Sequence, residues 1–151
     1  PTSYQDILEL PGIGPYTAGA LMSIAFNASY PVLDGNVERV FARLFNVDRP
    51  VKERSTRTLL WKTAKELIPE GNARCFNQSL MELGATICLP KRPDCDRCPV
   101  VTFCESHKLG LNDKRPVVTP GKRTTAIHVV VGIFPAANRK LINLLKFPSI
   151  S

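Results

Sequence analysis

The chain has 151 residues, of which 44% are hydrophobic and 22% are charged, and its formal net charge is +7. This length fits one domain-sized core rather than two complete domains, and the apolar content argues against a disordered chain. No apolar run approaches the roughly 20 residues needed to cross a bilayer, and the first residues lack a signal-peptide pattern. We therefore expect a globular protein with no membrane partner.

The positive charge is unevenly distributed along the chain. Residues 1–88 carry nine basic and nine acidic side chains, whereas residues 89–151 carry eleven basic and four acidic ones. Clustered Lys and Arg attract polyanions such as nucleic acid, because neutralised phosphates release counterions. Solubility explains the same excess equally well, so the charge alone leaves both interpretations open.

Helical patterns fill most of the chain. Apolar spacing predicts a short helix within residues 3–10, and Pro15 begins a second one that extends to Phe26. Asp34 is placed to cap a third helix, and two more amphipathic helices are predicted over residues 55–67 and 73–87. The apolar faces of the third and fourth helices are expected to comprise Val37, Val40, Phe41, Leu44 and Phe45, and Leu59, Leu60, Ala64 and Leu67.

The C-terminal third of the chain has a different pattern. Residues 105–123 are polar and contain two prolines, which indicates a linker. Residues 126–134 and 140–147 are typical of two strands around a turn. Because an isolated hairpin is marginally stable in water, we expect these strands to begin a larger sheet that continues beyond Ser151.

Four of the five cysteines crowd into the spacing C-x6-C-x2-C-x5-C, formed by Cys88, Cys95, Cys98 and Cys104. The odd total fits poorly with disulfides, so a metal site in a reducing, intracellular compartment is expected. Four thiolates suit zinc or an iron-sulfur cluster, and the single short knuckle favours the cluster. Unpaired buried thiols are the alternative. Cys75 has no partner at ligand spacing, and we expect it to be a small buried side chain.

The segment LPGIGPYT, from Leu10 to Thr17, joins two predicted helices through a proline and two glycines. Glycine accepts positive φ and leaves backbone N–H groups uncovered, so the amides of Gly12, Ile13 and Gly14 are candidates for binding a phosphate oxygen. A simple tight turn between packed helices is the alternative interpretation.

Three motifs together resemble one family. LPGIGPYTAGA is similar to the helix-hairpin-helix of the base-excision DNA glycosylases, VLDGNVERVFAR to the segment with their catalytic aspartate, and the cysteine spacing to their 4Fe-4S loop. The resemblance covers about residues 10–104. Within the family, Tyr16 stands where endonuclease III-like relatives place a lysine that attacks the sugar. This position, Asn36 and FNQSLMELGATIC resemble the adenine-specific, MutY-type branch.

The resemblance implies a function and roles for particular residues. It implies monofunctional hydrolysis of the N-glycosidic bond of adenine opposite 8-oxoguanine or guanine, in double-stranded DNA with the adenine extruded. Asp34 would stabilise the oxocarbenium-like sugar, Asn36 would orient Asp34, and Tyr16 would lie near the sugar. Asp34 also suits a plain helix cap, and Tyr16 a packing role. Lys91 and Arg92 would contact DNA, or form a solvated loop.

We therefore expect a mainly helical glycosylase fold whose catalytic domain spans residues 1–104, with a 4Fe-4S loop at 88–104. A linker would follow at 105–123, then the start of a Nudix-like β-containing domain at 124–151. In the family, the general-acid glutamate lies on an earlier helix, and no residue of this chain matches it. We therefore expect the chain by itself to release no base. We also expect it to be a monomer. The alternatives are an endonuclease III-like pyrimidine-damage glycosylase with lyase activity and a non-catalytic DNA-binding module.

Overall fold

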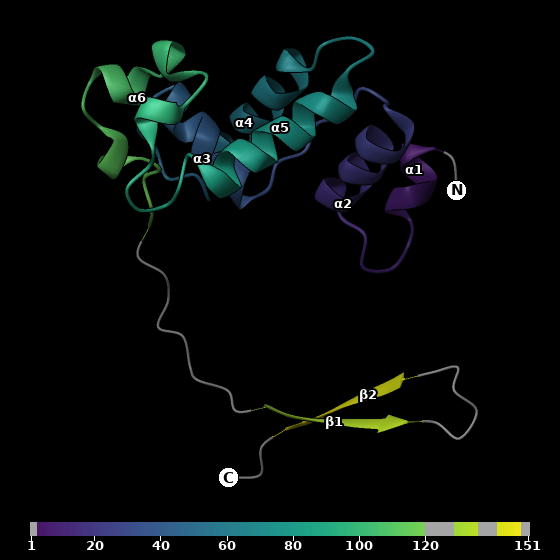
Figure 1. Ribbon diagram of the computed structural model, residues 1–151. Coiled ribbons are helices and arrows are strands. Elements are labelled where there is room, and N and C mark those ends of the chain that lie inside the picture. The colour runs from purple at the N-terminus through teal and green to yellow at the C-terminus, as the bar shows by residue number, and fades with distance from the viewer. Residues whose placement is uncertain (1–2, 120–128, 136–141, 149–151) are drawn as a thin grey trace. The chain divides into compact units, whose positions relative to one another are not determined.

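The computed structural model describes residues 3–119, 129–135 and 142–148 (Figure 1). The chain divides into two compact units, Pro1–Thr119 and Pro120–Ser151. None of the helices in the described residues has the length and apolarity to cross a bilayer. The first unit contains α1 (Tyr4–Leu8), α2 (Pro15–Ala20), the π-helical η1 (Leu21–Ala25), α3 (Gly35–Leu44), α4 (Arg54–Leu67), α5 (Ala73–Thr86), the 3-10 turns η2 (Cys95–Arg97), η3 (Val101–Phe103) and η4 (Asn112–Lys114), and α6 (Glu105–Lys108).

The first two helices form the hairpin that the sequence predicts. The Ser3 hydroxyl caps α1 by accepting a hydrogen bond from the Asp6 N–H at 3.1 Å. Gly12 has a φ of +80°, which a side chain would oppose, and Pro15 starts α2 at the first helical position. Helix α2 continues directly into η1, so the two elements together confirm the predicted second helix.

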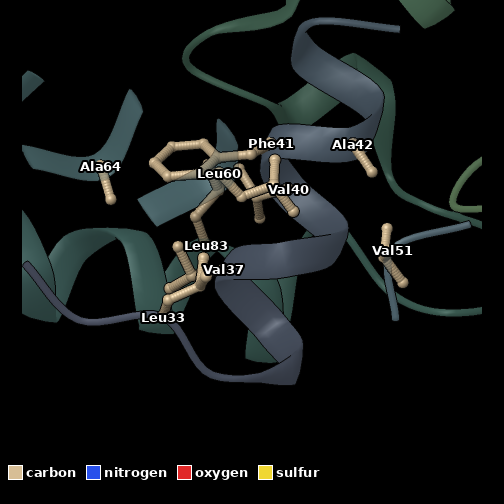
Figure 2. Close-up of a cluster of buried hydrophobic side chains, with 9 residues drawn as sticks. All are labelled: Leu33, Val37, Val40, Phe41, Ala42, Val51, Leu60, Ala64 and Leu83. Atoms are coloured by element: carbon tan, nitrogen blue, oxygen red, sulfur yellow. The ribbon is translucent and has the colours of Figure 1, made fainter. Parts of the chain in front are cut away.

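The core of the helical unit lies around α3. Figure 2 shows the α3 side chains Val37, Val40 and Phe41 beside Leu60 of α4 and Leu83 of α5, and all five are buried. Phe45, predicted to lie on this apolar face, is instead 45% exposed because α3 ends at Leu44. Leu59 and Leu67 on α4 were also predicted to be inward and are 53% and 42% exposed. The face of α4 that packs on the core is therefore narrower than its apolar pattern.

Two asparagines join α5 to the segment that follows η1. Asn27 accepts a hydrogen bond from the Arg74 N–H at 2.9 Å and donates to the Gly71 carbonyl at 2.7 Å, so it caps the first turn of α5 from a distant part of the chain. Asn77, 1% exposed, donates to the Tyr30 carbonyl at 2.9 Å. These bonds fix the hairpin half of the unit against α5.

Residues 105–119, which the sequence pattern assigns to a linker, fold here as part of the helical unit. Ser106 of α6 is fully buried. The carbonyls of Asn112 and Arg115 both accept hydrogen bonds from the Arg43 side chain of α3. These long-range contacts hold a polar segment that has no apolar periodicity of its own.

The second unit contains two antiparallel strands in its described residues, β1 (Val129–Pro135) and β2 (Ile142–Pro148). Val129 pairs with Pro148 and Pro135 with Ile142, so the seven residue pairs are in register. Both predicted strands are thus present, each extending one residue beyond its predicted end. Residues 126–128 and 140–141, predicted to begin the strands, lie outside the described residues.

Candidate active site and cysteine-lined cavity

Asp34 lies at the N-terminus of α3 with extended backbone angles. One carboxylate oxygen accepts a hydrogen bond from the Val37 N–H at 2.8 Å, and the other accepts from the Asn36 side-chain amide at 3.2 Å. The carboxylate therefore caps the helix and is oriented by Asn36 at the same time. The geometry therefore allows Asp34 to cap α3 and to present an oriented carboxylate to a ligand at the same time.

A chain of hydrogen bonds links this carboxylate to the cysteine segment. The Asn36 side-chain oxygen accepts from the Arg39 guanidinium at 2.9 Å, and the Arg39 Nε donates to the Cys88 carbonyl at 2.7 Å. Arg39 also donates to the Gly84 carbonyl at 2.6 Å. Asp34, Asn36, Arg39 and Cys88 thus form one continuous polar path along the side of α3.

The hairpin presents two free amides near its turn. Within the described residues, the N–H groups of Gly12 and Gly14 have no hydrogen-bond partner, whereas the Ile13 N–H donates to the Leu10 carbonyl at 3.1 Å. A Cβ added at either glycine would meet nothing within 4 Å, so no neighbouring element packs against the turn on that side. Of the three amides predicted for phosphate binding, Ile13 is already engaged.

Tyr16 follows the hairpin on α2 and is 42% exposed. In the described part of the chain, no hydrogen bond joins its hydroxyl to Asp34, whose partners are Asn36 and Val37. Lys91 and Arg92 are exposed in the loop after Cys88, and Arg92 has a φ of +52°. These side chains are available to a ligand, but the fold does not bring them to Asp34 through any direct bond.

The four clustered cysteines line a single cavity, with about 290 Å³ of space not filled by protein atoms and partly open to solvent. Cys88 follows α5, Cys95 lies in η2, Cys98 follows η2, and Cys104 precedes α6, so the fold gathers the four cysteines at one place. No three His, Cys, Asp or Glu side chains of the described residues are grouped so as to hold a metal ion. Cys75, predicted to be buried, is instead exposed on α5.

Arg43 reaches this cavity from α3 and is only 2% exposed. Its guanidinium donates to four backbone carbonyls, of Leu89, Pro90, Asn112 and Arg115, at 2.6 to 3.1 Å. It also donates to the Cys88 sulfur at 3.4 Å. No carboxylate of the described residues lies within ion-pair distance of it. A buried cation without a carboxylate makes this cavity favourable for an anion.

Burial changes the acidity of groups around the site. It raises the pKa of the Cys95 and Cys98 thiols, and the neighbouring cysteines raise both further. Burial lowers the pKa of Arg39, against an opposing effect of Cys88. It also raises the pKa of Glu38, one turn after Asp34, while Arg57 at 3.2 Å opposes that rise. The thiols are therefore costly to ionise unless a bound cation compensates them.

Sequence reasoning missed Arg39, Arg43, Asn112 and Gly84. Asn36, Arg39 and Arg43 are spaced i, i+3 and i+7, so the sequence places them on one face of the helix. Asn112 donates to the Cys95 sulfur at 3.4 Å, and its side-chain oxygen is buried without a partner. Gly84 lies so close to Asn36 that an added Cβ would stand 2.6 Å from the Asn36 Cβ. The helical spacing was the one signal available for the arginines.

Comparison with known proteins gives consistent matches. A protein-family model described as "Helix-hairpin-helix motif" matches residues 1–24. The chain is 44% identical over 119 residues to an adenine DNA glycosylase of Arabidopsis thaliana, covering 79% of this chain and 19% of the relative. The adenine DNA glycosylase of Buchnera aphidicola subsp. Schizaphis graminum is 39% identical over 108 residues, which cover 72% of this chain and 31% of the relative. The adenine DNA glycosylase of Homo sapiens is 43% identical over 99 residues, which cover 66% of this chain and 18% of the relative.

A solved structure matches as well. It is the structure of a thermostable thymine-DNA glycosylase, with a TM-score of 0.65 and 35% sequence identity, and the match covers 72% of this chain and 50% of that one. The chain spans between 18% and 31% of the length of the three relatives named above. The helical unit therefore has the fold of a helix-hairpin-helix DNA glycosylase, and the chain is related in sequence to the adenine DNA glycosylases.

Proposed function

We propose that the protein is a monofunctional adenine DNA glycosylase of base excision repair, acting inside the cell on adenine opposite 8-oxoguanine or guanine in duplex DNA. The observation that carries the proposal is the Asp34 carboxylate, held by Asn36 at 3.2 Å and by the Val37 N–H at 2.8 Å, in a chain related to glycosylases of that name. Thymine-DNA glycosylase activity is the second candidate function. It is less favoured because this chain is 35% identical to the thymine-DNA glycosylase and 39% to 44% identical to the three adenine DNA glycosylases named above.

The proposed chemistry needs a fixed negative charge beside the sugar. As adenine leaves, the anomeric carbon becomes oxocarbenium-like, and an oriented carboxylate lowers the energy of that state. Asp34 supplies the charge, Asn36 orients it, and Tyr16 contacts the sugar. Tyr16 has no amine, so it forms no Schiff base with the sugar, and the strand is left intact at the abasic site.

Binding comes from surfaces around this site. The free amides of Gly12 and Gly14 would hold a phosphate beside the extruded nucleotide, with Ile13 positioning the turn between them. Lys91 and Arg92 would contact the DNA from the cysteine loop. The proposed contacts are to the backbone, so they position the duplex without reading its sequence.

We also propose that Cys88, Cys95, Cys98 and Cys104 hold a 4Fe-4S cluster. Four thiols line the cavity, and N–H groups of Arg43 and Asn112 point at the sulfurs of Cys88 and Cys95. The thiols do not converge on a single-ion site, but in a 4Fe-4S cluster each thiolate binds a different iron, so such convergence is not required. Four thiolates on a core of formal charge +2 give about −2 in total, which would compensate the buried Arg43. The cluster would stabilise the loop that carries Lys91 and Arg92.

The domain organisation is part of the proposal. The helical unit, which includes the cysteine loop and extends to Thr119, would form the catalytic domain, and a Nudix-like domain would begin at residue 124. The described strand pair β1 and β2 is compatible with the start of such a domain. The protein would act as a monomer.

Single-turnover base release tests the proposal with the full-length protein. Duplexes would carry adenine opposite 8-oxoguanine, thymine opposite guanine, or an oxidised pyrimidine, each analysed with and without alkali. We expect adenine release with strand breaks only after alkali. Preferred release of thymine would select the second candidate, and nicking at pyrimidines without alkali would indicate a lyase and contradict the role given to Tyr16.

A further inference from the structure

A second concave surface lies beside the hairpin, away from the cysteine cavity. Gly14 and Tyr16 line one side of it, and Lys52, Arg54, Arg57 and Trp61 line the other, from the start of α4 and the loop before it. We call this surface the α4 groove. About 860 Å³ of space inside it is not filled by protein atoms, and it is more open to solvent than the cysteine-lined cavity.

Three cations and no carboxylate line the α4 groove. Arg57 is the one cation of the three that is paired, with Glu38 at 3.2 Å. Lys52 and Arg54 are exposed and form no ion pair within the described residues. Glu53 stands between them in the sequence but does not line the groove. Two free cations therefore face the groove beside a paired one.

The start of α4 carries two arginines in its first turn, and the nearest carboxylate along the chain is that of the N-cap residue Glu53. The side chain of Glu53 makes no capping hydrogen bond, and the first turn contains no acidic residue but has Arg54 and Arg57. The N-terminus of a helix carries partial positive charge, so cations there are unfavourable unless an anion offsets them. Across the groove, the Gly14 N–H also has no hydrogen-bond partner among the described residues. The hairpin side of the groove thus presents an unpartnered amide, and the α4 side presents the positive charge.

We propose that the α4 groove holds backbone phosphates of a DNA strand, with Lys52 and Arg54 as the contacting side chains and the Gly14 amide as a donor from the opposite side. The inference rests on the proposed function for the identity of its partner, DNA. Contacts of this kind are independent of base sequence, and each one releases counterions when DNA binds. Arg57 also lines the groove, but Glu38 compensates its charge, so we assign it no phosphate contact.

Binding of a labelled DNA duplex to the 151-residue chain tests the inference. Anisotropy titrations at several KCl concentrations would compare the wild-type chain with a Lys52→Ala/Arg54→Ala variant. We expect weaker binding and a slope of log K against log salt that is shallower by about 1.8, or about 0.9 for each lost phosphate contact. A Lys62→Ala/Lys65→Ala variant is the matched control, because it removes the same charge from exposed positions of α4 that do not line the groove. The control should change the slope little.

Trp61 gives a second, local readout because it is the only tryptophan of the chain and lines the α4 groove. DNA in the groove should protect its fluorescence from acrylamide quenching, and circular dichroism would verify that each variant is folded. Equal salt slopes for the wild-type chain and the Lys52/Arg54 variant would overturn the inference, as would duplex binding that leaves Trp61 unprotected. A loss confined to one DNA sequence would also overturn it, because base contacts would then be responsible. Adenine release by the full-length protein is measured separately, so the proposed function stands if only the groove fails.

Discussion

Gly84 of α5 approaches Asn36 of α3 so closely that a Cβ at residue 84 would lie 2.6 Å from the Asn36 Cβ and 3.1 Å from its Cα. Asn36 is also the residue that donates to the Asp34 carboxylate at 3.2 Å. The absence of a side chain at Gly84 therefore determines how near α5 lies to the candidate catalytic carboxylate. Packing between two helices and the geometry of the site depend on the same contact.

Gly84→Ala should destabilise the helical unit. Overpacking of a filled interface costs about 1–3 kcal/mol, which exceeds the roughly 1 kcal/mol that alanine gains over glycine within a helix. Urea unfolding would measure the difference. Gly35→Ala is the control, because a Cβ at Gly35 in α3 meets nothing within 4 Å, and its stability should equal or exceed that of the wild type. A Gly84→Ala variant as stable as Gly35→Ala would show that α3 and α5 separate without cost.

Asp34→Asn should separate catalysis from helix capping. Asparagine caps helices about as well as aspartate, so the free energy of unfolding should stay within about 0.5 kcal/mol of the wild-type value. Base release by the full-length protein should fall at least about a hundredfold, because the charge beside the sugar is lost. Asp34→Ala serves for comparison and should cost about 1 kcal/mol of stability as well. Unchanged base release by Asp34→Asn would leave Asp34 as a cap and favour a non-catalytic module.

The features that the sequence predicts well have local causes. The α3 cap depends on Asp34 and the Val37 N–H three residues later, and the turn at Gly12 depends on a positive φ that glycine favours. Helical periodicity located α4 and α5, but it overestimated the buried face of α4, where Leu59 is 53% exposed. A periodic pattern reports which residues share a face and does not report how wide the neighbouring element is.

The features that the sequence did not predict depend on distant partners. Arg43 is buried because carbonyls 46 to 72 residues away accept its hydrogen bonds, and a carbonyl gives no sequence signal. The same bonds hold residues 112–115, whose polarity and prolines suggested a linker. The exposure of Cys75 follows from the side of α5 that meets α3, which its sequence neighbours do not specify.

Arg43→Gln should destabilise the protein strongly. The shorter side chain leaves the carbonyls of Leu89, Pro90 and Arg115 without their donor, and the expected loss is about 3 kcal/mol in the free energy of unfolding. Arg49→Gln is the control at an exposed position of the following loop, where we expect a change within about 0.5 kcal/mol. Comparable unfolding midpoints for the two variants would contradict the structural role assigned to Arg43.

Cysteine substitution should distinguish the four clustered thiols from the fifth. If Cys104 ligates the cluster, Cys104→Ala should lose most of the iron and sulfide that the wild-type protein contains, expected at about four of each per chain. Cys75→Ala should keep both, because Cys75 is exposed on α5 and does not line the cavity. Iron and sulfide analysis with visible absorption spectra would measure this in anaerobically purified protein. About one zinc per chain without sulfide would replace the cluster by a structural zinc site. Wild-type protein without bound metal would instead favour unligated thiols, and the buried charge of Arg43 would then need another anion.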